Sequence, residues 1–74
     1  MIFPPKLQLL AEIEGYKDVF SMLDATITDS INPGICTNEG CDYTVNVEPD
    51  CGHGYCEECE TQTVQSASIL AGII

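Results

Sequence analysis

Positive charge is almost missing from this chain of 74 residues. Twelve acidic residues outnumber two basic ones, Lys6 and Lys17, so the formal net charge is −10 and no Lys or Arg follows residue 17. Proteins that bind phosphate groups draw their affinity from Lys and Arg, and this composition therefore argues against direct binding of nucleic acid. An acidic surface instead favours a protein partner with a basic surface, with solubility alone as the alternative.

Long hydrophobic runs are missing as well. No segment approaches the roughly 20 apolar residues that a membrane span requires, and the apolar segment 69–74 is far too short. The first residues also lack the basic region and apolar stretch of a secretory signal. We therefore expect no membrane segment and a cytoplasmic protein.

A chain of this size has little core to rely on. A domain this small buries only about 60% of the surface of its unfolded chain, and small domains usually add disulfides, a metal or a partner subunit. The chain has five cysteines. Their odd number and the missing export signal favour a metal site in a reducing cytoplasm over a disulfide framework.

Four of these cysteines form two closely spaced pairs. Cys36 and Cys41 enclose four residues, Cys56 and Cys59 enclose two, and 14 residues separate the pairs. Two such turns can surround one Zn²⁺ with four thiolates in a closed tetrahedral shell. That shell has no open position for water or substrate, so the predicted site is structural.

Two neighbouring residues leave the ligand set open. Cys51 or His53 can replace one of the four cysteines as a zinc ligand, although both lie in the loop between the pairs. Redox catalysis by the Cys56–Cys59 pair is disfavoured, because Glu57 and Glu58 lie between the thiols and no Lys or Arg is near in sequence to lower their pKa. No Ser or Cys has an evident catalytic base, and we expect a protein that is not an enzyme.

Residues 4–31 read as a helical hairpin. Pro4 and Pro5 suit the start of the first helix, and Gly15 suits its end. The sequence Asn32-Pro33-Gly34 predicts a turn that ends the second helix. In the first helix Leu7, Leu10, Ala11 and Glu14 fall on one side, with Leu9 and Ile13 beside them. The second helix has its apolar stripe at Tyr16, Val19, Phe20, Leu23, Ile27 and Ile31.

Residues 35–60 form the predicted zinc-binding module. Apolar and polar residues alternate from Tyr43 to Glu48, which predicts a half-buried strand. In residues 61–74, Thr61 or Thr63 can cap a helix, and a strand through residues 63–65 is the alternative. Residues 69–74 either cover the core or form an interface. Four glycines suit the tight turns of the module: Gly34, Gly40, Gly52 and Gly54.

The module resembles a zinc ribbon. More closely, the chain is similar to small proteins of bacteriophages and marine viruses. The resemblance lies in Pro33-Gly34-Ile35-Cys36, Val47-Glu48-Pro49-Asp50, Cys56-Glu57-Glu58-Cys59 and Ala71-Gly72-Ile73-Ile74. It implies a viral or bacterial cytoplasmic origin, with Cys36, Cys41, Cys56 and Cys59 as the ligands. A weaker resemblance is to the DksA/TraR-type regulators of bacterial RNA polymerase, but the chain has a wider first cysteine pair and no long coiled coil.

Together these observations predict one small α+β domain over 1–74: a zinc ribbon with a short β-hairpin, an N-terminal helical hairpin and a short C-terminal helix. The predicted function is a non-catalytic, zinc-stabilised protein–protein interaction module, with a phage-encoded modulator of a host protein such as the transcription machinery as the leading hypothesis. The alternatives are a zinc ribbon that binds nucleic acid and a virion or assembly component. The oligomeric state stays open.

Overall fold

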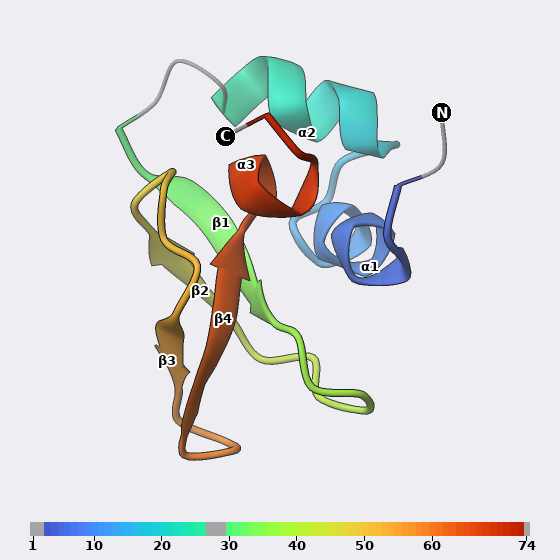
Figure 1. Ribbon diagram of the computed structural model, residues 1–74. Helices are drawn as coiled ribbons and strands as arrows, with labels where there is room; N and C mark the ends of the chain where they lie inside the picture. Colours follow the sequence, from blue (N-terminus) through green and yellow to red (C-terminus); the bar gives the residue numbers. More distant parts are fainter. Residues whose placement is uncertain (1–2, 27–29, 74) are drawn as a thin grey trace.

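The structure is a computed structural model that describes residues 3–26 and 30–73. Its strands form one antiparallel sheet in the order β2-β1-β4-β3, and the helices gather at one end of this sheet (Figure 1). The small α+β fold expected from the sequence is thus confirmed. In chain order the described elements are α1 (Pro5–Ile13), α2 (Val19–Thr26), β1 (Asn32–Cys36), β2 (Thr44–Val47), β3 (Gly54–Cys56), β4 (Thr61–Ser66) and α3 (Ala67–Leu70).

Helix α1 begins and ends where its sequence predicts. Pro4 is its N-cap and Pro5 its first residue, where a missing N–H is not needed for hydrogen bonding within the helix. Gly15 follows the helix with a φ of +85°. The N–H of Tyr16 donates to the carbonyl of Ala11 (2.9 Å), and that of Gly15 donates to Glu12 (3.1 Å). This pair of bonds is a Schellman motif, and it directs the chain into α2.

Helix α2 is shorter than the predicted stripe. Asp18 precedes its first residue and accepts a hydrogen bond from the N–H of Ser21 (2.8 Å), as an N-cap does. This bond lowers the pKa of the Asp18 carboxyl. Val19 and Met22 are buried, whereas the side chain of Phe20 is 63% exposed. Phe20 packs edge-to-face on Phe3, with ring centroids 5.2 Å apart, so the prediction that Phe20 faces the core is wrong.

The remaining residues of the predicted stripe lie outside α2 or outside the described residues, apart from Leu23. Ile31 lies just before β1 and is 55% exposed, so its placement on the buried stripe is also wrong. Ile27 lies outside the described residues. Tyr16 precedes the helix and is partly buried against the core.

The predicted turn at Asn32-Pro33-Gly34 is wrong, because these residues open the buried strand β1. Pro33 is tolerated there since the register between β1 and β4 begins only at Gly34, so its missing N–H removes no bond from that pairing. Gly34 is needed for close packing. A Cβ at this position would lie 2.8 Å from Cγ2 of Val47 and 3.0 Å from Cγ1 of Val64.

Strand β2 confirms the alternating stretch, although Val45 and Asn46 in its middle are exposed. After residue 60 the alternative of a strand holds: β4 spans Thr61–Ser66, and the helix α3 that follows has only four residues. Ser66, rather than a threonine, caps α3 by accepting from the N–H of Ile69 (3.1 Å). In the described part of the tail, Leu70 and Ala71 pack on the core.

Two clusters of buried side chains hold the fold together. The main core joins the helices to β1 and consists of Leu7, Leu10, Ala11, Val19, Met22, Ile35 and Ala67. The second, between the strands, consists of Cys36, Cys56 and Val64, with Cys41, Tyr43, Val47 and Cys59 packed against it. Cysteines thus make up most of the second cluster, at the end of the sheet that lies away from α2 and α3 (Figure 1).

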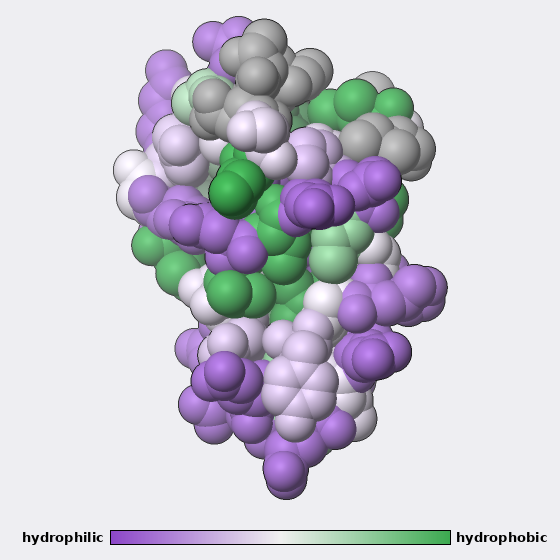
Figure 2. Space-filling model, turned by 90° about the vertical axis from the view of Figure 1, so that its left-hand side faces the viewer, coloured by the Kyte–Doolittle hydropathy of each residue, from purple (hydrophilic) through white to green (hydrophobic). Residues whose placement is uncertain are grey.

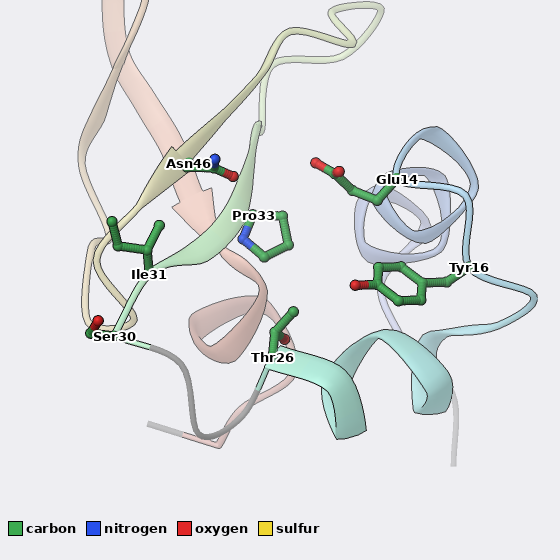
Figure 3. A pocket seen from close by; sticks show the side chains of 7 residues that line it. All are labelled: Glu14, Tyr16, Thr26, Ser30, Ile31, Pro33 and Asn46. Atoms are coloured by element: carbon green, nitrogen blue, oxygen red, sulfur yellow. The ribbon is translucent and has the colours of Figure 1, made fainter.

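The surface is mostly hydrophilic. On the side of the molecule where β2 and β3 run, hydrophilic side chains border a band of apolar ones and gather at the end away from the helices (Figure 2). A cleft of about 500 Å³ lies between the helical hairpin and the start of the sheet (Figure 3). Among the described residues, no helix has the length and apolar character needed to cross a membrane.

Candidate metal centre

Four cysteines come together at one end of the sheet. Cys36 ends β1 and Cys56 ends β3, and both are buried. Cys41 lies in the turn between β1 and β2, and Cys59 in the turn after β3; both are partly buried. The sulfur atoms of all four lie within 4.8 Å of one another. The sheet therefore brings together two pairs of cysteines that are far apart in the chain.

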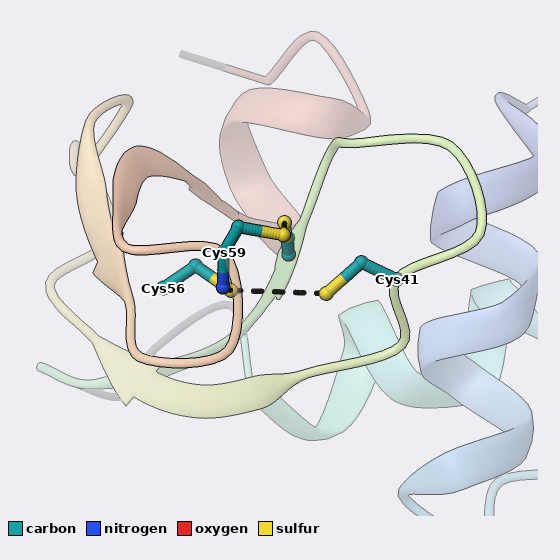
Figure 4. Close-up of side chains that lie close together, drawn as sticks. Cys41, Cys56 and Cys59 are labelled. Carbon is teal, nitrogen blue, oxygen red and sulfur yellow. Dashed lines mark hydrogen bonds between the residues drawn. The ribbon is translucent and has the colours of Figure 1, made fainter.

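Two of the distances between sulfurs match those of a tetrahedral shell. Sγ of Cys36 lies 3.9 Å from that of Cys59, and Sγ of Cys41 lies 3.7 Å from that of Cys56 (Figure 4). Zn–S bonds of about 2.3 Å at tetrahedral angles place neighbouring sulfurs about 3.8 Å apart. All five cysteines of the chain are free. The four clustered side chains can thus enclose one metal ion.

Local backbone geometry shapes both turns. In the first turn, Gly40 has a φ of +82°, a conformation that favours glycine, and the N–H of Cys41 donates to the carbonyl of Asn38 (3.2 Å). In the second, the N–H of Cys59 donates to Sγ of Cys56 (3.3 Å). In the second turn a backbone N–H group thus points toward sulfur.

The other glycines assigned to the turns have different places. Gly34 and Gly54 lie in β1 and β3, where a Cβ would press on Val64. At Gly52 a Cβ would meet no atom within 4 Å. The prediction that all four glycines serve the turns is therefore wrong for the two in strands.

Thr63, which the sequence suggested as a helix cap and not as a neighbour of the metal ligands, supports the site from β4. The hydroxyl of Thr63 lies 3.1 Å from Sγ of Cys36 and 3.0 Å from the hydroxyl of Thr61. The carbonyl of Thr63 accepts from the N–H of Thr37 (2.8 Å) and from its hydroxyl (2.7 Å). Thr63 thus orients Cys36 and fastens the turn that leads to Cys41. Only the pairing of β1 with β4 reveals this role, and the sequence carries no signal for that pairing.

The thiols perturb one another strongly. Burial disfavours the Cys36 thiolate, but hydrogen bonds from the Thr63 hydroxyl and the N–H of Asn38 outweigh it and lower the pKa of Cys36 to about 6. The N–H of Tyr43 favours the Cys41 thiolate, yet burial and the neighbouring thiols outweigh that bond and raise the pKa of Cys41 to about 12. Burial also raises the pKa of Cys56. A cation bound among these sulfurs would favour the thiolate forms of Cys41 and Cys56, which burial disfavours.

The surroundings of the cysteine cluster are acidic, and one lysine side chain lies close to it. Residues 35–60 contain seven acidic residues and no Lys or Arg. Lys6 of α1 reaches this region from the other end of the chain and donates to the backbone carbonyl of Cys41. Sequence reasoning also missed Lys6 as a neighbour of the site, because the contact depends on how α1 packs.

Neither alternative ligand joins the cluster, which consists of Cys36, Cys41, Cys56 and Cys59. His53 is exposed. The N–H of Cys51 donates to Glu48 (3.0 Å) and its carbonyl accepts from Ser66 (3.0 Å), so Cys51 shapes the turn between β2 and β3 through its backbone. The geometry therefore separates the four paired cysteines from the two residues between the pairs.

No protein-family model matches this chain, and no curated protein or solved structure matches it either. The features that bear on its function are the cysteine cluster, the charge of the chain and the form of its surface.

Proposed function

We propose that this chain is a zinc-stabilised, non-catalytic protein–protein interaction module whose metal centre is of the zinc-ribbon type. The observation that carries the proposal is the cysteine cluster, with sulfur–sulfur distances of 3.7 and 3.9 Å in two pairs. A tetrahedral set of four sulfurs suits zinc or iron. Zinc is the better choice because a Zn²⁺ site of four thiolates is closed and purely structural.

The metal contributes to folding in this proposal. The second core cluster has Val64 as its one fully buried residue besides Cys36 and Cys56, so few hydrophobic contacts hold β3 and the two turns. Metal binding supplies the missing stability, since the free energy of binding to a site that exists only in the folded state adds to the free energy of unfolding. The ion thereby fixes the turns that carry five of the twelve acidic residues: Glu39, Asp42, Glu57, Glu58 and Glu60.

Charge supports a protein partner. A net charge of −10 steers basic surfaces toward this chain and repels nucleic acid. Four thiolates around Zn²⁺ form a centre of charge −2, so the metal does not make the surface more positive. We infer that the module binds a basic surface of another protein.

Native mass spectrometry of protein purified under reducing conditions without chelator tests the metal part. We expect one zinc per chain and a mass that shows the loss of four protons. Iron in its place would give a coloured protein and would refute the choice of zinc. A metal-free, folded chain would refute the metal-stabilised module as a whole.

Capture experiments test the partner part. Immobilised zinc-loaded chain is incubated with a nuclease-treated bacterial lysate, and we expect retained basic proteins that elute with increasing salt, because salt screens charge. A gel shift with DNA and RNA at low salt is the counter-test, since affinity for phosphate is greatest there. Nucleic-acid binding without protein capture would favour the alternative zinc ribbon.

A further inference from the structure

We infer that the cleft between the helical hairpin and the sheet, hereafter the hairpin–sheet cleft, binds an arginine side chain of a basic partner segment. The cleft has a volume of about 500 Å³, within the range of about 300–1,000 Å³ typical of ligand sites. This inference deepens the proposed function and rests on its protein-partner part. It assigns the contact to a place separate from the cysteine cluster.

Polar groups converge on the cleft from two sides. The carboxylate of Glu14 and the hydroxyl of Tyr16 point from the helical side toward the ring of Pro33, and the amide end of Asn46 points to the same space from β2 (Figure 3). Within the described part of the chain, these three side-chain ends form no hydrogen bond with protein. Among the described residues, none of these three groups is occupied by a hydrogen bond that a ligand would have to displace.

The framework of the cleft is fixed by backbone hydrogen bonds. The Schellman motif at Gly15 positions Glu14 and Tyr16, through the bond from the N–H of Tyr16 to Ala11. Pro33 and Asn46 are direct partners in the register of β1 and β2. A framework set in advance lowers the entropy that binding costs.

The chemistry of the lining selects a cation with a flat, partly apolar body. Glu14 supplies a negative charge, and none of the side chains that line the cleft is basic. The Tyr16 ring offers an aromatic face, and Ile31 and Pro33 offer apolar surface. A guanidinium group binds a carboxylate through two parallel hydrogen bonds and stacks on aromatic rings. Lysine can supply the charge but lacks both of these planar contacts.

The test uses the zinc-loaded chain labelled with ¹⁵N and three capped pentapeptides, Gly-Ser-X-Ser-Gly, in which X is arginine, lysine or citrulline. Citrulline keeps the shape of arginine but has no charge. We expect saturable NMR shifts at the amides of Gly15, Tyr16 and Asn46 with the arginine peptide, weaker ones with lysine and none with citrulline. Equal shifts with citrulline, or shifts confined to the acidic turn at residues 57–60, would overturn the assignment.

Matched variants separate the cleft from general attraction by an acidic protein. E14Q should lower the affinity for the arginine peptide by about fivefold or more, since it removes a charged hydrogen-bond acceptor. E12Q removes the same charge from an exposed position of α1 that does not line the cleft, and we expect less than a twofold change. N46A should also lower the affinity for the arginine peptide, and it tests the cleft without a change of charge. Equal losses in E12Q and E14Q would refute the cleft.

These outcomes are independent of those for the proposed function. If the arginine peptide fails to shift the cleft amides while protein capture succeeds, the cleft assignment is wrong and the interaction module stands. If the peptide binds at the cleft but the protein purified without chelator carries no zinc, the metal part of the proposed function is wrong and the cleft stands.

Discussion

Lys6 donates a hydrogen bond from its Nζ to the backbone carbonyl of Cys41, across 35 positions of sequence. The second residue of α1 is thereby joined to the turn that carries one of the four clustered sulfurs. This contact places a positive charge beside a centre that carries a charge of −2 when Zn²⁺ is bound. It also connects the helical layer to the end of the sheet away from α2 and α3.

Replacing Lys6 with methionine should therefore weaken zinc binding. Removal of a group that hydrogen-bonds to the surroundings of a metal typically lowers affinity about tenfold or more, and partial exposure of Lys6 reduces this to roughly three- to tenfold. Competition with a chromophoric chelator measures the change. The second lysine of the chain is the matched control: K17M removes the same charge from an exposed residue outside the cysteine cluster and should leave the affinity nearly unchanged. Equal effects of both variants would show that only the net charge matters.

Substitution by serine should have different effects at Cys59, which lies in the cluster, and at Cys51, which lies outside it. C59S removes a sulfur from the cluster, so we expect loss of tight zinc binding and loss of ordered structure over the two turns and β3, because binding energy and folding energy are coupled at such sites. C51S should keep one zinc per chain and most of the stability, since Cys51 acts mainly through its backbone. Zinc content and circular dichroism of both variants check this. The ligand set is wrong if C51S loses the metal and C59S retains it.

Features controlled by neighbouring residues could be predicted from the sequence. Pro5 and Gly15 mark the limits of α1 because their conformational preferences act within one turn of helix, and the alternation after Tyr43 predicts β2. The spacing of the cysteines singles out the two pairs, because each pair is set by one local turn. These expectations depended on no contact between distant segments.

Tertiary pairing explains the features that the sequence did not reveal. Asn32-Pro33-Gly34 has the local preference of a turn, but pairing with β2 along all three residues, and with β4 from Gly34 onward, makes it part of a buried strand. The same pairing places Thr63 beside Cys36. Phe20 is exposed because Asp18 caps α2 and the buried face of that helix runs through Val19 and Met22.

Gly34 should tolerate no side chain. The Cβ of an alanine would lie 2.8 Å from Cγ2 of Val47, 3.0 Å from Cγ1 of Val64 and 3.2 Å from the carbonyl oxygen of Gln65, and overpacking of this kind costs roughly 1–3 kcal/mol. We expect G34A to lower the free energy of unfolding of the zinc-loaded protein by about this amount in urea. G52A is the control, because a Cβ there meets no atom within 4 Å. A destabilisation by G52A as large as that of G34A would contradict the packing argument.

Glu60 should be the opposite case, a position where glycine is better than the native residue. It has a φ of 56° and donates its N–H to the carbonyl of Cys56 (2.7 Å), so it closes the turn after β3 in a left-handed conformation. For a residue with a Cβ this conformation costs about 1–2 kcal/mol, of which the greater freedom of glycine in the unfolded chain offsets a part. E60G should therefore stabilise the zinc-loaded protein by up to about 1 kcal/mol and slow the release of zinc to a chelator. E60A removes the same charge but keeps a Cβ in the left-handed conformation, and we expect no comparable gain. If E60A stabilises the protein as much as E60G, relief of repulsion among the acidic residues of this turn is the cause, and the backbone is not.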